Sequence, residues 1–383
     1  MEERKNLTGN NLHSLGDIVL SCGFPETAPP DDSRCPVSAY IPEFAPSHLL
    51  DEARSGWLPK LIRKCIGCEL CSTCPETSFA LCADKLLLLG GIREGNFQRA
   101  FGGALEAVVS LQLKPETKQK RLKWVNSQLK IAEAGEVALF VGCAPYYDAL
   151  LSEQIGFKAT DEARAAVELL NAVGVKPVLL EDEVCCGADR LHAGDSDSFH
   201  ALGLRNRDLL KARGVKTIVT ICNDCRFTLQ NRYLGRIPEW DFEVTSLADF
   251  LIAYGGKLAF IPWKKLVAVQ PPDRYSDPKG LNSVNKLLER IPEIEVALLP
   301  TGHPSTFGSW NQFDAVSKAM ETALLKSADS TGASIFLSPS LRVLVRLFEG
   351  RRPGSWEETS IALGGFYDFL AKRHAVTEDF AGA

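Results

Sequence analysis

The sequence is 383 residues long, which exceeds one ordinary domain, so we expect two or three domains. Hydrophobic residues make up 45% and charged residues 24%, as in soluble globular proteins. The net charge of -5 gives no basic surface, which excludes nucleic acid as an expected partner. The sequence shows neither the apolar core of a signal peptide nor a run of about 18 apolar residues, so a cytoplasmic protein is expected.

The first part of the chain, residues 1–112, is rich in cysteine and proline. Its pattern predicts short helices over Leu58–Cys65 and Ser78–Leu89. Residues 113–134 are expected to connect this part to the rest. The run Pro115–Ala134 is polar, lacks glycine and carries apolar residues at helical spacing, so we predict a connector helix there.

Short apolar runs alternate with helical stretches in residues 135–255. Strands are predicted, in chain order, at Val137–Val141, Lys176–Leu180 and Val215–Ile221. Helices are predicted over Asp161–Ala172 and Ser198–Arg213. Strands that alternate with helices in this way indicate an α/β layer structure with parallel strands.

The final part, residues 256–383, repeats this order of elements. Its expected strands are Leu266–Val269, Glu295–Leu299 and Gly332–Leu337. Its expected helices are Leu281–Arg290, Asp314–Ser327 and Leu341–Phe348. An internal duplication is therefore predicted, with cysteines kept only in the first copy.

The twelve cysteines are unevenly distributed along the chain. Seven lie within Cys22–Cys82, five lie within Cys143–Cys225, and none follows. A cytosolic protein keeps its thiols reduced, so this clustering indicates metal binding and not disulfide bonds.

The run Cys65–Pro75 contains four cysteines at three-residue intervals and ends in Cys-Pro. This dense spacing is typical of iron–sulfur proteins, whereas structural zinc sites more often join two separated pairs of ligands. In two-cluster ferredoxins the cysteine before proline serves the other cluster, and Cys35 also precedes a proline. We therefore predict a cubane 4Fe–4S cluster held by Cys65, Cys68, Cys71 and Cys35. Three cysteines either form a second N-terminal centre or stay as thiols, namely Cys74, Cys22 and Cys82.

The second group of cysteines follows the strands predicted in residues 135–255, and consists of Cys143, Cys185, Cys186, Cys222 and Cys225. The carboxyl ends of parallel strands meet at one edge of a sheet, so these thiols are expected to converge there. Five thiolates exceed the ligands of one tetrahedral zinc, and on a four-iron cluster one of them is free to bridge two irons. The alternative is a buried thiol pair beside zinc bound at Cys222-x-x-Cys225.

This pattern, with Cys185-Cys186-Gly187 at its centre, resembles the cysteine-rich CCG domain of heterodisulfide reductase catalytic subunits. The same domain occurs in the iron–sulfur subunits of glycolate oxidase, of anaerobic glycerol-3-phosphate dehydrogenase and of lactate-utilisation complexes. The N-terminal part, with CGF at Cys22–Phe24 and CIGCELCSTCP, resembles the dicluster ferredoxin domain fused to it. The resemblance implies an α+β protein, in which a mostly helical ferredoxin-type domain precedes two α/β CCG-type repeats.

The resemblance also implies that the five cysteines of residues 135–255 hold a noncubane 4Fe–4S cluster, and that the N-terminal cysteines hold one or two cubanes. Family members commonly carry the five-cysteine pattern twice. The matching stretches here have no thiol, which excludes a second noncubane cluster; they are Pro271–Asp273, Thr306–Gly308 and Ser338–Leu341. The ferredoxin-like part also departs from the family pattern, because the interval from Cys71 to Cys74 is one residue shorter than in that pattern.

The expected function is therefore that of an iron–sulfur subunit of a multi-subunit oxidoreductase. It relays electrons between the N-terminal cubane and the noncubane cluster to a quinone, a disulfide or another carrier. Expected partners are a flavoprotein, other iron–sulfur subunits and a membrane subunit linked to quinone, through which the chain is peripheral at the membrane. Two alternatives stay open: a catalytic thiol or heterodisulfide reductase with substrate at the noncubane cluster, and a zinc-stabilised scaffold.

Two histidines are candidates for the surroundings of a substrate or quinone. His192 follows the cysteine pair and His303 lies in the copy without cysteines; the alternative for His192 is a surface side chain. No GxGxxG or P-loop motif occurs, so this chain is not expected to bind flavin or nicotinamide.

Overall fold

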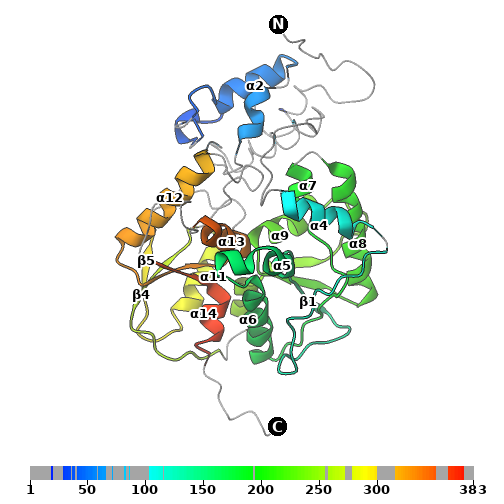
Figure 1. Ribbon diagram of the computed structural model, residues 1–383, viewed down its shortest axis with the longest axis vertical. Helices are drawn as coiled ribbons and strands as arrows, with labels where there is room; N and C mark the ends of the chain where they lie inside the picture. The colour runs from blue at the N-terminus through cyan, green and yellow to red at the C-terminus, as the bar shows by residue number, and fades with distance from the viewer. Residues whose placement is uncertain are drawn as a thin grey trace. The chain divides into compact units, whose positions relative to one another are not determined.

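The computed structural model describes residues 19, 29–35, 37–38, 41–57, 59–65, 71, 82, 86, 103–114, 116–192, 195–254, 258–271, 278–299, 315–350 and 361–374. The chain divides into two compact units, whose elements are labelled in Figure 1. The first unit consists of Met1–Gly103, Asp189–Asp197 and Thr306–Met320, and the second contains the rest. Among the described helices, none combines the length and apolarity that crossing a bilayer requires.

Helix α2 (Pro46–Arg54) is a regular helix of the first unit. It begins at a proline, which lacks the N–H that would be unpaired there, and it buries Leu49 and Leu50. Two short 3₁₀ helices flank it, η1 (Asp32–Arg34) and η2 (Lys60–Lys64). The helix predicted over residues 58–65 is thus a 3₁₀ segment of five residues. The helix predicted over residues 78–89 lies outside the described residues, except for positions 82 and 86.

Three parallel strands form the first sheet of the second unit, in the order β1 (Val137–Phe140), β2 (Thr217–Thr220) and β3 (Glu243–Ser246). After its first residue each of β1 and β2 is buried, as expected of a parallel sheet covered by helices. The strands predicted at residues 137–141 and 215–221 are confirmed.

The strand predicted at residues 176–180 is reduced to one bridging position. Val178 pairs in parallel with Ala138, through its N–H to Val137 O (2.9 Å) and through Leu139 N–H to its own carbonyl (3.1 Å). On its other edge this segment pairs with Ala132, whose N–H bonds Pro177 O (3.1 Å).

Four parallel strands form the second sheet, in the order β5 (Glu295–Leu298), β4 (Leu266–Val269), β6 (Ile335–Ser338) and β7 (Ala362–Gly365). If Val178 is counted as a strand position, the first sheet has the order Val178, β1, β2, β3. In both sheets the second strand along the chain then lies at the edge, followed by the first, third and fourth. The repeat of topology supports the predicted duplication.

Helices alternate with the strands of both copies along the chain. In the first copy they are α4 (Ala104–Gln112), α5 (Ala144–Ile155), α6 (Ala159–Ala172), α7 (Ala188–His192), α8 (Ser196–Ala212), α9 (Asn223–Phe227), which continues into a π-helical turn (Thr228–Arg232), and α10 (Leu247–Tyr254). In the second copy they are α11 (Pro278–Leu288), α12 (Ala315–Ser330), α13 (Leu341–Gly350) and α14 (Phe366–Ala371). The chain is therefore an α+β protein with parallel sheets, as predicted.

The connector helix predicted over residues 115–134 is wrong. Residues 116–134 form turns and irregular chain, with bonds such as Val125 N–H to Leu122 O (3.0 Å). The segment continues towards the sheet, where Ala132 N–H bonds Pro177 O (3.1 Å). The apolar residues of this irregular segment recur at intervals that resemble those of an amphipathic helix, although no helix forms.

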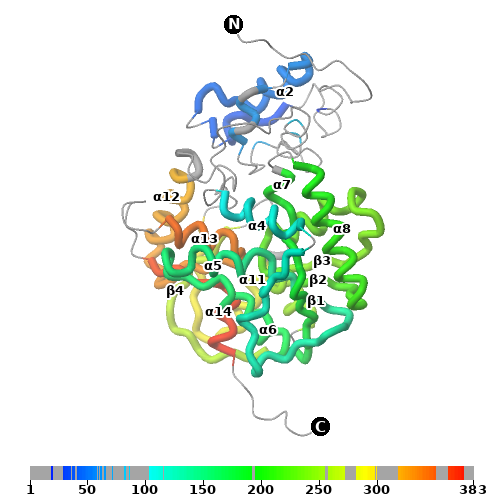
Figure 2. The backbone as a smooth tube through the Cα atoms, turned by 45° about the vertical axis from the view of Figure 1, so that its right-hand side comes forward, coloured from blue at the N-terminus to red at the C-terminus, as the bar shows by residue number. Residues whose placement is uncertain are grey.

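The two copies pack through helices. Helix α6 contacts α14, and α5 contacts α13, as Figure 2 also shows. Glu162 of α6 accepts the backbone N–H groups of Tyr367 (3.1 Å) and Asp368 (2.9 Å) at the start of α14. A Cβ on Gly365 would collide with this carboxylate, so glycine is required there. Burial raises the pKa of Glu162 to about 8, although the two N–H groups lower it.

Candidate metal centre

Three loops deliver the five cysteines of the second group, and each follows a strand or strand position of the first sheet. Cys143 comes after β1 and occupies the N-cap position of α5. Cys222 comes after β2 and occupies the N-cap position of α9, whose first turn contains Cys225. Cys185 and Cys186 follow the Val178 position and precede α7. The loops therefore lie at the carboxyl ends of neighbouring parallel strands.

The structure brings the five thiols together in a continuous series. The sulfur atoms of Cys143 and Cys185 are 4.0 Å apart. Cys186 hydrogen-bonds with Cys185 and with Cys225, and Cys225 in turn with Cys222. Cys143 and Cys222 are partly exposed, whereas the three thiols between them are buried.

This crowding has an electrostatic consequence. Hydrogen bonding to Cys185 and burial raise the pKa of the Cys186 thiol, and hydrogen bonding to Cys186 and Cys222 raises the pKa of Cys225. Thiolates packed this closely need a compensating positive charge, and a coordinating metal deprotonates its thiols. A donor set of five sulfurs fits a cluster of several irons. Among the described residues, no three or more His, Cys, Asp and Glu side chains are spaced to hold one metal ion.

Two glycines let the backbone run close to these sulfurs. Gly187 has φ +78°, and its N–H donates to Cys185 Sγ (3.3 Å). A Cβ there would lie 2.9 Å from Phe199 Cδ2. Gly142 has φ +64°, and a Cβ there would lie 3.1 Å from Cys225 Sγ. Both positions require a residue without a side chain.

A buried ion pair fixes two of the cysteine loops to one another, and the sequence did not reveal it. Arg121 Nη2 lies 2.6 Å from Glu183 Oε1 and 2.5 Å from Gly142 O. Glu183 also accepts the N–H groups of Gly142 (2.7 Å) and Val141 (3.1 Å). Burial raises the pKa of Glu183 to about 7, against the lowering effect of Arg121. One available signal was a glutamate two residues before the cysteine pair.

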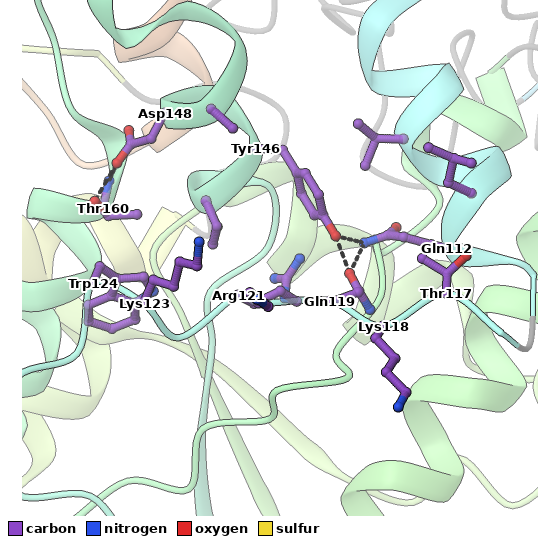
Figure 3. Close-up of a pocket in the computed structure, with 15 residues that line it drawn as sticks. Gln112, Thr117, Lys118, Gln119, Arg121, Lys123, Trp124, Tyr146, Asp148 and Thr160 are labelled. Atoms are coloured by element: carbon purple, nitrogen blue, oxygen red, sulfur yellow. Dashed lines mark hydrogen bonds between the residues drawn. The ribbon is translucent and has the colours of Figure 1, made fainter.

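Three polar side chains connect the segment of Glu183 and Cys185 to α4, and Figure 3 shows the hydrogen bonds among them. Gln112 Nε2 donates to Gln119 Oε1 (2.8 Å) and to Tyr146 Oη (3.2 Å), and Tyr146 hydrogen-bonds Gln119. Gln112 Oε1 accepts the backbone N–H of Cys185 (3.1 Å), and Gln119 Nε2 donates to Glu183 O (3.0 Å). The cysteine pair is thus held from the α4 side by amides.

Two further buried side chains hold the cysteine pair from α8 and the segment that follows α9. Asn206 accepts the Val184 N–H (3.1 Å) and donates to the carbonyls of Val184 (3.1 Å) and Cys185 (3.3 Å). Tyr233 Oη donates to Cys186 O (2.9 Å). These bonds satisfy the buried backbone of a loop that no sheet ladder can pair.

The second copy contacts the Cys222 loop. Leu341 N–H donates to Ile221 O (3.2 Å), and Arg342 lies 4.0 Å from Asp224, which stands between Cys222 and Cys225. In the stretch that matches the cysteine loop, Ser338 hydrogen-bonds Gln270 and accepts the N–H of Ser340 (3.1 Å). Hydroxyl and amide groups therefore replace the thiols there. The matching stretches at residues 272–273 and 306–308 lie outside the described residues.

Four of the N-terminal cysteines are described, and all are buried: Cys35, Cys65, Cys71 and Cys82. The Asp31 N–H bonds Cys71 O (2.8 Å), which brings the segment of Cys35 against that of Cys71. Cys22, Cys68, Cys74 and His303 lie outside the described residues, as does the side chain of His192. The N-terminal ligand sets and both histidine roles therefore stay predictions, and so does iron binding by the five converging thiols.

Comparison with known proteins adds to this geometry. Residues 137–230, which contain all five converging cysteines, match the family model of the cysteine-rich CCG domain. The resemblance expected from the cysteine spacing is confirmed.

Three curated relatives match larger parts of the chain. An uncharacterized iron–sulfur protein of Methanococcus maripaludis is 25% identical over 69% of this chain and 54% of its own length. One subunit of the dihydromethanophenazine:CoB–CoM heterodisulfide reductase of Methanosarcina mazei is 28% identical over 57% of this chain and 52% of its own. One subunit of the anaerobic glycerol-3-phosphate dehydrogenase of Escherichia coli is 24% identical over 53% and 52%. The chain spans about half the length of these relatives.

A solved structure of a hypothetical protein from Helicobacter pylori has a similar fold. It matches 94% of this chain and 71% of its own, with a TM-score of 0.52 and 10% sequence identity. At this identity the likeness shows the fold alone.

Proposed function

We propose that this chain is an iron–sulfur electron-transfer subunit of a multi-subunit oxidoreductase, and that its five converging cysteines hold a noncubane 4Fe–4S cluster. The observation that carries the proposal is the continuous series of thiols from Cys143 through Cys185, Cys186 and Cys225 to Cys222. Relatives named as iron–sulfur protein and as subunits of a reductase and a dehydrogenase support it.

The residues around the thiols have defined tasks in this proposal. When bound, an iron–sulfur cluster supplies reversible one-electron chemistry. The chain contributes the ligands, buries three of the five sulfurs and fixes two of the loops through Glu183 and Arg121. N–H groups directed at sulfur, such as that of Gly187, help to set the potential of a bound cluster.

The N-terminal unit completes a relay in this proposal. A cubane cluster held by Cys35, Cys65, Cys68 and Cys71 exchanges electrons with the noncubane cluster. A flavoprotein or another iron–sulfur subunit delivers the electrons, and a quinone, a disulfide or another carrier takes them up. Cys22, Cys74 and Cys82 hold any further centre.

The experiment is paramagnetic resonance on anaerobically purified full-length protein, oxidised and reduced. Cys222→Ser removes one thiol of the series, and Ser340→Ala is the matched control at the corresponding place in the copy without thiols. We expect two distinct cluster signals in the wild type and in Ser340→Ala. Cys222→Ser keeps the N-terminal signal and loses or alters the other. Two unaltered cluster signals in Cys222→Ser would contradict the assignment.

A second candidate is a catalytic terminus that reduces a thiol or disulfide at the noncubane cluster. The partial exposure of Cys143 and Cys222 favours it, because a small thiol has access to that side of the series. The absence of thiols in the second copy counts against it. Adding mercaptoethanol to the oxidised protein distinguishes the two: the spectrum changes for a catalytic terminus and stays unchanged for a relay.

A further inference from the structure

A cavity of about 400 Å³ lies beside the thiol loops, among α4, residues 117–124 and the first turns of α5 (Figure 3). Part of its lining is apolar, with Val108 and Leu111 of α4 and Pro145 and Ala149 of α5. The side chain of Arg121, which holds the Gly142 loop, also lines it. The cavity plays no part in the proposed cluster site.

Two buried N–H donors of residues that line this cavity have no hydrogen-bond partner. Arg121 Nη1 is one of them; the side chain is only 2% exposed, and its guanidinium lies over the Tyr146 ring, 5.3 Å from the centroid. The indole Nε1 of Trp124 is the other. Buried donors are almost always satisfied in native proteins, so two such donors around one cavity indicate an acceptor-bearing ligand.

The charge of the lining favours an anion. Lys118, Lys120 and Lys123 line the cavity together with Arg121, and Asp148 is the one carboxylate among its lining residues. Asp148 is already bonded by the N–H groups of Ala159 (2.5 Å) and Thr160 (3.3 Å) and by the Thr160 hydroxyl. Figure 3 shows the Lys118 amine directed away from Tyr146, so Lys123 is the more suitable cation.

We propose that this cavity binds a small organic anion with oxygen acceptors at two positions, of the dicarboxylate class. Arg121 and Lys123 take the anionic end, Trp124 donates to a second ligand oxygen, and the carbon chain lies against Leu111 and Pro145. Because Arg121 also bonds Gly142 and Glu183, the ligand contacts the side chain that positions Cys143 and Cys185. The site goes beyond the proposed electron transfer and does not require it.

Calorimetric titration of the anaerobically purified full chain tests the site, with succinate as the probe and succinamide as its uncharged analogue. We expect succinate to bind and succinamide to bind at least about tenfold more weakly, since hydrogen bonds to charged groups are the stronger ones. Trp124→Phe removes the indole donor and Lys123→Met removes the charge; each weakens succinate binding several-fold. Leu111→Trp puts a larger side chain into the lining of the cavity, and we expect it to weaken succinate binding as well.

Trp263→Phe is the matched control, because Trp263 Nε1 is also buried and unpartnered but lies far along the chain in the second copy. It leaves succinate binding unchanged. Equal affinity for succinate and succinamide, no binding of succinate, or equal succinate affinity in Trp124→Phe and wild type would each overturn the proposal. Iron content measured on the same samples keeps this result separate from the cluster assignment, since the binding test does not depend on iron.

Discussion

The carboxylate of Glu183 accepts the backbone N–H of Gly142 at 2.7 Å, and so ties the segment that delivers Cys185 to the loop that delivers Cys143. Arg121 completes the arrangement, since its Nη2 bonds both Glu183 and the Gly142 carbonyl. The side chains of this ion pair are only 2% and 1% exposed. Loss of one partner therefore leaves the other charge buried without compensation.

Glu183→Gln tests this tie. The variant keeps the shape of the side chain but leaves the Arg121 charge uncompensated, so we expect the free energy of unfolding to fall by about 3 kcal/mol. Urea denaturation at pH 8.5, above the pKa of about 7 at which Glu183 ionises, measures it. Glu181→Gln, two residues away and exposed, is the control and stays near the wild type. A Glu183→Gln protein as stable as the control would show that the pair does not hold the loops.

Gly187→Ala tests the turn in the cysteine pair. Position 187 has a positive φ, which strains a residue with a side chain, and the new Cβ lies 2.9 Å from Phe199 Cδ2. Because both effects act together, we expect a loss of about 3 kcal/mol in the free energy of unfolding. Gly214→Ala is the control, because Gly214 has a φ of +72° with no atom within 4 Å of its Cβ position. Strain alone costs the control about 1 kcal/mol. Equal losses in the two variants would remove the steric explanation.

Glu162 makes the stability of the second unit depend on pH. Burial raises its pKa from 4.5 to about 8, so the folded protein retains a proton that the unfolded chain releases in this window. The contribution to stability is complete below pH 4.5 and is lost as pH rises towards 8. Each pH unit between these limits then removes about 1.4 kcal/mol of the free energy of unfolding.

Glu162→Gln cannot titrate, so its free energy of unfolding falls less steeply from pH 5 to pH 8 than that of the wild type. Urea denaturation across this range gives both slopes. Glu153→Gln, at an exposed position of α5, serves as the control and follows the wild type. Parallel curves for the wild type and Glu162→Gln would contradict a protonated Glu162 in the folded protein.

Much of the second unit was predictable because its signals are local. The strands at residues 137–140 and 266–269 are short apolar runs, and the cysteines that follow strands converge because parallel strands end at one edge. The irregular segment at residues 116–134 was not predictable, since its apolar spacing imitates a helix. The Arg121–Glu183 pair was not predictable either, because its partners stand 62 residues apart and neither belongs to a motif.

The measurement that tests the central claim most directly is the iron, zinc and acid-labile sulfide content of anaerobically purified full-length protein. Two four-iron clusters predict a brown protein with about eight irons and as many sulfides per chain, and loss of the cluster at the converging thiols leaves about four. A colourless protein with stoichiometric zinc and no sulfide would contradict the claim that the converging cysteines hold an iron–sulfur cluster.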